Sequence, residues 1–90
     1  MEELSELGRM LVVGQALLDD DRTADYLMRR VSVSAATLKR YLGELRSFGC
    51  LIVSRRESSG WVYRLENRGE VRTRLERWLE LERTRSLVGP

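Results

Sequence analysis

The stretch that decides the fold is SAATLKRYLGELRSFG, residues 34–49. Its leucines recur at spacings of four and three, which is the period of one helix face: Leu38, Leu42 and Leu45. Ser34 is a favourable N-cap residue, and Gly49 stands where a left-handed residue commonly ends a helix. Together these residues predict an amphipathic helix over residues 34–48.

Two further helices are expected before this one. Thr23 is a good N-cap for a short helix over residues 23–30, and residues 31–33 then make a tight connection to the next helix. Upstream, the sequence predicts a helix over residues 3–18 that ends at three consecutive aspartates, which are unfavourable at a helix C-terminus. The residues on one side of this helix recur at alternating spacings of three and four: Leu4, Leu7, Leu11, Gly14 and Leu18.

After Gly49 the pattern becomes that of strands. Residues 51–56 are rich in aliphatic and β-branched side chains, and residues 61–65 alternate apolar with other residues. The polar segment over residues 57–60 supplies the glycine that a hairpin turn needs, so we expect a β-hairpin over residues 51–66. On it, Trp61 is expected to cover the small core rather than to stack on a base.

A last helix is expected over residues 68–86, opened by a capping-box-like pair, Asn67 and Glu70. Its apolar stripe, continued by Glu82, consists of Val71, Leu75, Trp78 and Leu79. The fold class that follows is mainly α with a β-hairpin (α+β), in a single domain over residues 1–90. Two short helices joined by a tight turn and followed by a hairpin are typical of a winged helix-turn-helix.

The residues from Thr23 onwards resemble the winged helix-turn-helix of bacterial transcription regulators, and most of all that of DeoR-like repressors. The shared pattern is a Thr-capped helix, a short turn, the run Ser-x-x-Thr-aliphatic-x-Arg-x-Leu-x-x-Leu, and a glycine before the wing. In this chain it falls on Ser34, Thr37, Leu38, Arg40, Leu42, Leu45 and Gly49. The resemblance covers about residues 23–66. It implies a winged helix-turn-helix with additional N- and C-terminal helices, in which residues 34–48 are the recognition helix and residues 51–66 the wing.

Composition argues against several classes of protein. The 90 residues contain no histidine and one cysteine, Cys50, which excludes an internal disulfide and the common zinc sites and removes the usual general base. We therefore expect no enzyme, no metal and no cofactor, and Cys50 is expected to be a small buried hydrophobe. No apolar run approaches the roughly 20 residues of a membrane span, so we expect a cytoplasmic protein without membrane contact. The resemblance to bacterial regulators implies association with the nucleoid.

The distribution of charge favours a polyanionic partner. Residues 1–21 carry six acidic side chains and one arginine, a net charge of −5. Residues 22–68 carry ten basic and four acidic side chains, a net charge of +6, and residues 69–90 carry five and four, a net charge of +1. The alternative for the basic middle is a solvated surface without a ligand.

Helix 34–48 buries its leucine stripe, so the positions off that stripe face outward. The major groove admits one α-helix, whose N-terminal residues reach the base edges. The expected contacts from this helix are Ser34, Ala35, Ala36, Thr37, Lys39, Arg40 and Tyr41, and from the wing Arg55, Arg56 and Arg64. Alternatives remain open at this point: Ser34 as a plain N-cap, Tyr41 packed against the wing, and the wing arginines on a solvated strand face.

These features predict sequence-specific binding of double-stranded DNA by a small transcriptional regulator, in the simplest case a repressor. The alternatives are a winged-helix protein-interaction module and an accessory DNA-binding protein of replication or partition. Because such regulators usually read two half-sites, we also expect a homodimer through the terminal helices. Its expected interface is Leu4, Leu7, Leu11, Val71, Leu75, Trp78 and Leu79, and the alternative is that these stripes close the core of the monomer.

Overall fold

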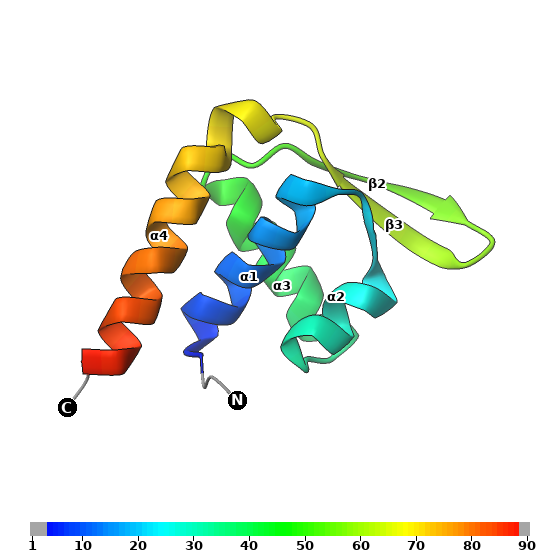
Figure 1. Cartoon of the computed structure of the whole chain (residues 1–90). Coiled ribbons are helices and arrows are strands. Elements are labelled where there is room, and N and C mark those ends of the chain that lie inside the picture. The colour runs from blue at the N-terminus through cyan, green and yellow to red at the C-terminus, as the bar shows by residue number, and fades with distance from the viewer. Residues whose placement is uncertain (1–3, 89–90) are drawn as a thin grey trace.

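The structure, a computed structural model, describes the backbone of residues 4–88 and the side chains of residues 4–85. Within these residues the chain forms α1 (Glu6–Asp19), β1 (Arg22–Thr23), α2 (Ala24–Val31), α3 (Ala35–Ser47), β2 (Ile52–Glu57), β3 (Gly60–Leu65) and α4 (Arg68–Val88). The strands form one antiparallel sheet in the order β1-β3-β2, so the expected α+β class is confirmed. The β2–β3 hairpin projects beyond the helices on the side away from α4 (Figure 1).

The central helix of the core is α1. It is buried on nearly every side from Met10 to Leu18, and it packs against α2, α3 and α4. A helix that is apolar all round belongs in the interior, whereas the leucine spacing alone indicated a single stripe. The helix begins after Ser5, whose Oγ accepts the backbone N–H of Gly8 at 3.0 Å. Glu3, where the sequence predicted the start of this helix, lies outside the described residues.

The expected dimer interface is wrong for most of its residues, because α4 packs on α1 and closes the core of one chain. At most 2% of the residue surface is exposed at four of the seven positions: Leu11, Val71, Leu75 and Leu79. Leu4 and Trp78 are half-buried against the same core, and Leu7 is exposed. The alternative, in which both stripes serve the monomer, is therefore confirmed for these helices, and homodimerisation itself stays a prediction.

The hairpin turn is shorter than the four residues expected. Glu57 pairs with Gly60, so only Ser58 and Ser59 form the loop, and Gly60 follows it with φ +114°. Neither serine of the loop has a positive φ, so the turn is not of the primed types, and the glycine that follows it supplies the positive φ. No sequence pattern predicted β1, because this strand is too short to show an alternation and is defined by the pairing of Arg22 with Tyr63 on β3.

Asn67 ties the base of the hairpin to the start of α4. Its Oδ1 accepts the backbone N–H of Leu51 at 2.9 Å, and its Nδ2 donates to the carbonyl of Gly49 at 2.8 Å and to Oε2 of Glu70 at 3.2 Å. The expected pair with Glu70 is thus formed between side chains, but the capping oxygen faces the hairpin instead of the helix. Both ends of the hairpin are consequently fixed to the helical body.

Candidate nucleic-acid interface

Local hydrogen bonds fix the position of α3. Ser32 adopts a left-handed conformation, φ 55°, and its N–H donates to the carbonyl of Met28, which turns the chain from α2 towards α3. The Oγ of Ser34 accepts the N–H of Thr37 and donates to its Oγ1, both at 3.2 Å. Ser34 is therefore the N-cap of α3, as one alternative held. Gly49, with φ +101°, follows the end of the helix as expected.

The outward side of α3 carries small residues and cations. Ala35, Ala36, Lys39 and Arg40 are exposed, as expected, and Thr37 is half-buried. Small side chains in the first turn allow another molecule to approach the backbone closely. This side of the helix therefore has the shape and charge that a major-groove contact needs.

The expectation that Tyr41 faces outward is wrong. It is 1% exposed, so it does not face outward and cannot contact DNA. Its position, three residues after Leu38 and four before Leu45, places it on the buried stripe of the same helix. A tyrosine at such a position contributes its ring to the core, whereas Tyr41 was expected to lie off the leucine stripe.

Arg40 is engaged by an acidic side chain from another helix. Its Nη2 donates to Oε1 of Glu6, at the start of α1, and about half of each side chain remains exposed. An exposed ion pair of this kind is worth about 0–1 kcal/mol, so a phosphate can displace the glutamate at small cost.

The three wing arginines differ in their surroundings. Arg55 forms ion pairs with Asp21 at 3.0 Å and with Glu57 at 2.5 Å. Arg56 lies with Cζ 5.6 Å from the centroid of the Trp61 ring. Arg64 is exposed and makes no ion pair within the described part of the chain. Arg56 and Arg64 are thus available to a phosphate, whereas Arg55 is neutralised.

Asp21 connects the wing to α4. Its carboxylate accepts from Arg55 at 3.0 Å and from Arg68 at 2.7 Å. Burial raises the pKa of Asp21, but the hydrogen bonds from the two arginines outweigh it and hold the pKa below its ordinary value. The carboxylate therefore stays ionised, and it holds Arg55 beside the body of the protein.

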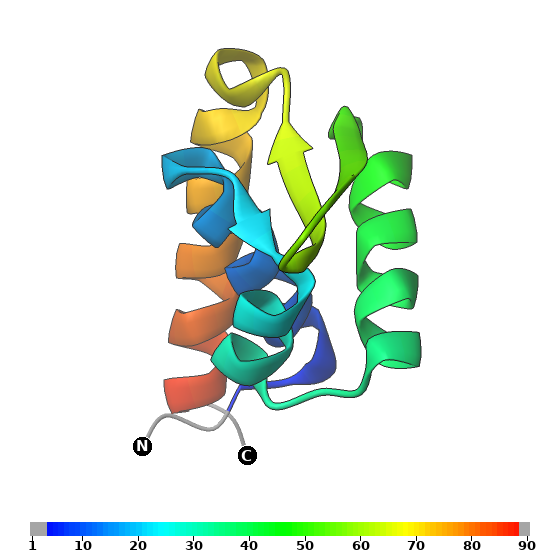
Figure 2. The same cartoon turned by 90° about the vertical axis from the view of Figure 1, so that its right-hand side faces the viewer.

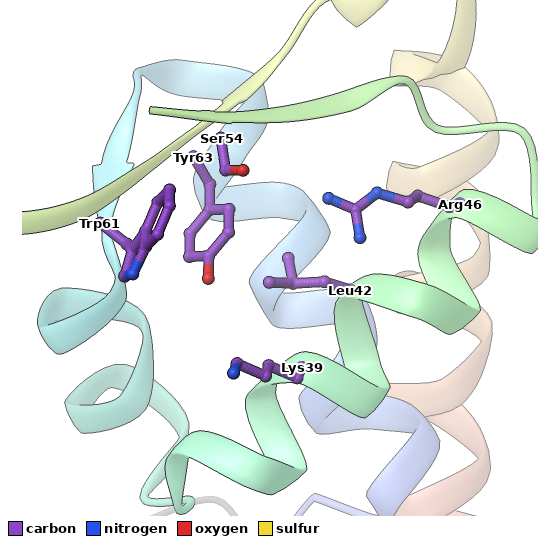
Figure 3. Close-up of a pocket in the computed structure, with 6 residues that line it drawn as sticks. All are labelled: Lys39, Leu42, Arg46, Ser54, Trp61 and Tyr63. Atoms are coloured by element: carbon purple, nitrogen blue, oxygen red, sulfur yellow. The ribbon is translucent and has the colours of Figure 1, made fainter. Parts of the chain in front are cut away.

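A groove of about 340 Å³ lies between α3 and the hairpin (Figure 3). It is lined by Lys39, Leu42, Arg46, Ser54, Trp61 and Tyr63. Figure 3 shows the Lys39 ammonium and the Arg46 guanidinium pointing from α3 into this space, towards the side that carries the two aromatic rings. Figure 2, which views the molecule from the hairpin side, shows α3 along one side and α4 along the other.

Arg46 lines the groove, although it was not among the site residues expected from the sequence. Its Nε and Nη2 donate to the carbonyl of Ile52 at 3.2 and 3.1 Å, which joins α3 to β2. The available signal was its spacing of seven from Lys39, because two helical turns return to the same face. A cation seven positions after Lys39 belongs to the same side of α3.

The expectation that Trp61 covers the core is also wrong. It is 45% exposed at the rim of the groove, whereas Tyr63 and Leu65 on the same strand are buried. The hairpin projects beyond the helices, so the ring nearest its loop has no core to cover.

Among the described residues, no group of three histidine, cysteine, aspartate or glutamate side chains could hold a metal ion. No described helix is long and apolar enough to cross a membrane. Cys50 is 2% exposed, and burial raises the pKa of its thiol, although Arg74 opposes the shift. The expected buried hydrophobe is confirmed at this position.

Comparison of the chain with protein-family models, with curated proteins and with solved structures finds no match. Function is therefore inferred from the geometry and charge of α3 and the hairpin.

Proposed function

We propose that the chain is a winged helix-turn-helix protein that binds double-stranded DNA, with α3 in the major groove and the β2–β3 hairpin as the wing. The order of α2, a short connection, α3 and an antiparallel hairpin supports this assignment. The observation that carries it is the position of Lys39 and Arg46 on α3, facing a projecting hairpin that bears Arg56.

The roles of the side chains follow from their positions. Ala35 and Ala36 let the first turn of α3 approach the base edges, where a methyl group can meet that of thymine. Lys39 and Arg40 donate to guanine or to phosphates, and Arg56 and Arg64 contact the backbone beside the wing. A protein that occupies its DNA site excludes other proteins from it, so we extend the proposal to a small transcriptional repressor.

Salt-dependent binding tests the proposal. Fluorescence anisotropy with a labelled duplex should show tighter binding at low salt, with a slope of log affinity against log salt of about −0.9 for each phosphate contact. Replacing Lys39 with Gln should flatten the slope by about one unit, whereas Arg77→Gln, an equal charge change at an exposed position of α4, should leave it unchanged. Binding no tighter than millimolar at low salt would refute the proposal.

Sequence specificity needs its own experiment. Selection of bound duplexes from a randomised pool should return one motif, and a motif with two half-sites would support the predicted homodimer. A pool that remains random after selection would limit the proposal to non-specific binding, as in an accessory protein of replication or partition.

A second candidate is a protein-interaction module. It is favoured by apolar side chains at the base of the hairpin, since Leu51 is 58% and Val53 43% exposed. In that case Leu51→Ser would abolish partner binding, and DNA would not bind.

A further inference from the structure

The groove between α3 and the hairpin contains an exposed aromatic ring, which contact with an intact duplex does not require. Trp61 is directly opposite Arg56 in the register of the hairpin, and Tyr63 is opposite Ser54, so these four side chains share one face. Trp61 is 45% exposed, and the Arg56 guanidinium lies over its ring with Cζ 5.6 Å from the centroid. Away from its ends, the bases of a B-form duplex are paired and stacked on both sides, so they offer such a ring no face to stack on.

The opposite side of the groove supplies hydrogen-bond donors. Arg46 uses Nε and Nη2 for the carbonyl of Ile52, which leaves Nη1 for another acceptor. Among the described residues, no hydrogen bond or ion pair engages Lys39 or the hydroxyl of Tyr63. Two cations on α3 thus face the ring side of the groove, and the Tyr63 hydroxyl points from that side into the same space (Figure 3).

We propose that this groove binds one unpaired nucleotide at a duplex end or overhang, with its base stacked on Trp61 and its phosphate held by Lys39 and Arg46. The proposal rests on the proposed DNA binding and specifies the form of DNA that is preferred. Cationic grooves with exposed aromatic rings are the general means of binding single-stranded nucleic acid, because every base has a face that can stack.

The shape of the groove favours a nucleotide that is part of DNA over a free one. Its volume of about 340 Å³ is at the low end for small-molecule sites, which enclose most of their ligand, and this groove is open to solvent. A nucleotide attached to a duplex that α3 already holds arrives at a high effective concentration, so an open site is sufficient.

The test compares four ligands by anisotropy or competition: a blunt duplex, the same duplex with a short overhang, the overhang strand alone, and a free deoxynucleoside monophosphate. We expect the overhang to tighten binding roughly fivefold or more. Trp61→Ala should abolish this preference and leave the affinity for the blunt duplex unchanged, whereas Trp61→Phe should keep most of it.

The matched control is Tyr26→Ala. Tyr26 is 40% exposed with Arg22 over its ring at 4.6 Å, but it lies on α2 outside the groove, so its removal should not change the preference. Thermal denaturation verifies that each variant is folded. A second readout is the emission of Trp61 in a Trp78→Phe protein, which should be quenched by the overhang and not by the blunt duplex.

Each contrary result has a separate meaning. Equal binding of blunt and overhanging duplexes by the unaltered protein, or a preference that survives Trp61→Ala, would overturn the inference and leave duplex binding intact. Binding of the free nucleotide as tight as that of the overhang would overturn the assignment to DNA. Failure of every DNA to bind would refute the proposed function together with the inference.

Discussion

Ser5 and Glu82 are 77 positions apart in the sequence, and the Oγ of Ser5 donates a hydrogen bond of 2.6 Å to Oε1 of Glu82. Ser5 is also the N-cap of α1, through its bond from Gly8. Glu82 is 7% exposed, so without Ser5 its carboxylate would lose a donor in a buried setting. One hydroxyl group thus both starts α1 and joins it to α4.

Loss of this hydroxyl should cost more than loss of an ordinary cap. We expect Ser5→Ala to lower the free energy of unfolding by about 2 kcal/mol, because the cap and the donor to a buried carboxylate are lost together. Ser34→Ala, which removes an exposed N-cap of α3, should cost about 1 kcal/mol. Urea denaturation of both variants measures the difference, and equal losses would show that the bond to Glu82 contributes nothing.

Gly14 permits the close approach of three helices. A Cβ there would lie 3.2 Å from Cδ2 of Leu45 on α3 and 3.3 Å from Cδ2 of Leu75 on α4, and both leucines are fully packed. We expect Gly14→Ala to destabilise the fold by about 1 kcal/mol despite the better helix propensity of alanine, and Gly14→Val by about 3 kcal/mol.

Gly43 is the matched control for Gly14. It is exposed in the middle of α3, and a Cβ there would have no neighbour within 4 Å. Gly43→Ala should therefore stabilise the protein by up to about 1 kcal/mol. Thermal denaturation of both alanine variants checks the opposite signs, and a shared sign would contradict the packing argument.

The stability supplied by Asp21 should depend on pH. Its pKa is lower in the folded than in the unfolded chain, so its contribution is complete above the unfolded value of about 4 and is lost as the pH falls through the lower folded value. Asp21→Asn should therefore cost about 1–2 kcal/mol at neutral pH and progressively less in acid.

Asp25→Asn provides the comparison for Asp21. The carboxylate of Asp25 is exposed and pairs with Arg29 one turn along α2. Its loss should cost less than about 0.5 kcal/mol. Urea denaturation over a range of pH distinguishes the two aspartates, and a cost of Asp21→Asn that is constant down to acid pH would contradict the assignment.

Local signals predicted the helices and the hairpin, because each leaves a short-range pattern. Thr23 and Ser34 cap their helices, and Gly49 has the positive φ that its position indicated. The error at Tyr41 was avoidable, because its spacing from Leu38 and Leu45 is that of the buried stripe. The other errors concern contacts between distant elements. No local pattern shows that Trp61 projects beyond the core or that Arg46 reaches the carbonyl of Ile52.

The apolar stripes of the two terminal helices were expected at a dimer interface, and this error too concerns contacts between distant elements. A stripe of apolar residues has the same period whether it packs within one chain or between two chains. Here α1 is surrounded by three helices, so the second apolar stripe, on α4, is used within the monomer. The number of neighbours around α1 is a property of the tertiary structure and leaves no trace in the spacing of leucines.

Substitution of Trp78 should change the stability of the protein and not its oligomeric state. Its ring lies 5.3 Å from that of Phe48, and it packs against the core from α4. We expect Trp78→Ala to lower the free energy of unfolding by about 2–4 kcal/mol and to leave the sedimentation coefficient unchanged. A variant of unchanged stability that sediments as a smaller species would restore the terminal helices as a dimer interface.

Removal of Glu6 should tighten DNA binding, because its carboxylate occupies Arg40, which the proposed function assigns to DNA. In Glu6→Gln the guanidinium contacts a phosphate without displacing a glutamate, and one negative charge fewer lies beside the DNA, so the slope of log affinity against log salt should steepen by up to about one unit. The affinity at low salt should rise up to about fivefold, the worth of an exposed ion pair. Glu80→Gln makes the same charge change at an exposed position of α4 and should leave the slope unchanged. Anisotropy titrations of the two variants at several salt concentrations measure both quantities. If they bind alike, Arg40 does not contact DNA, and Lys39, Arg46 and the wing must account for the binding.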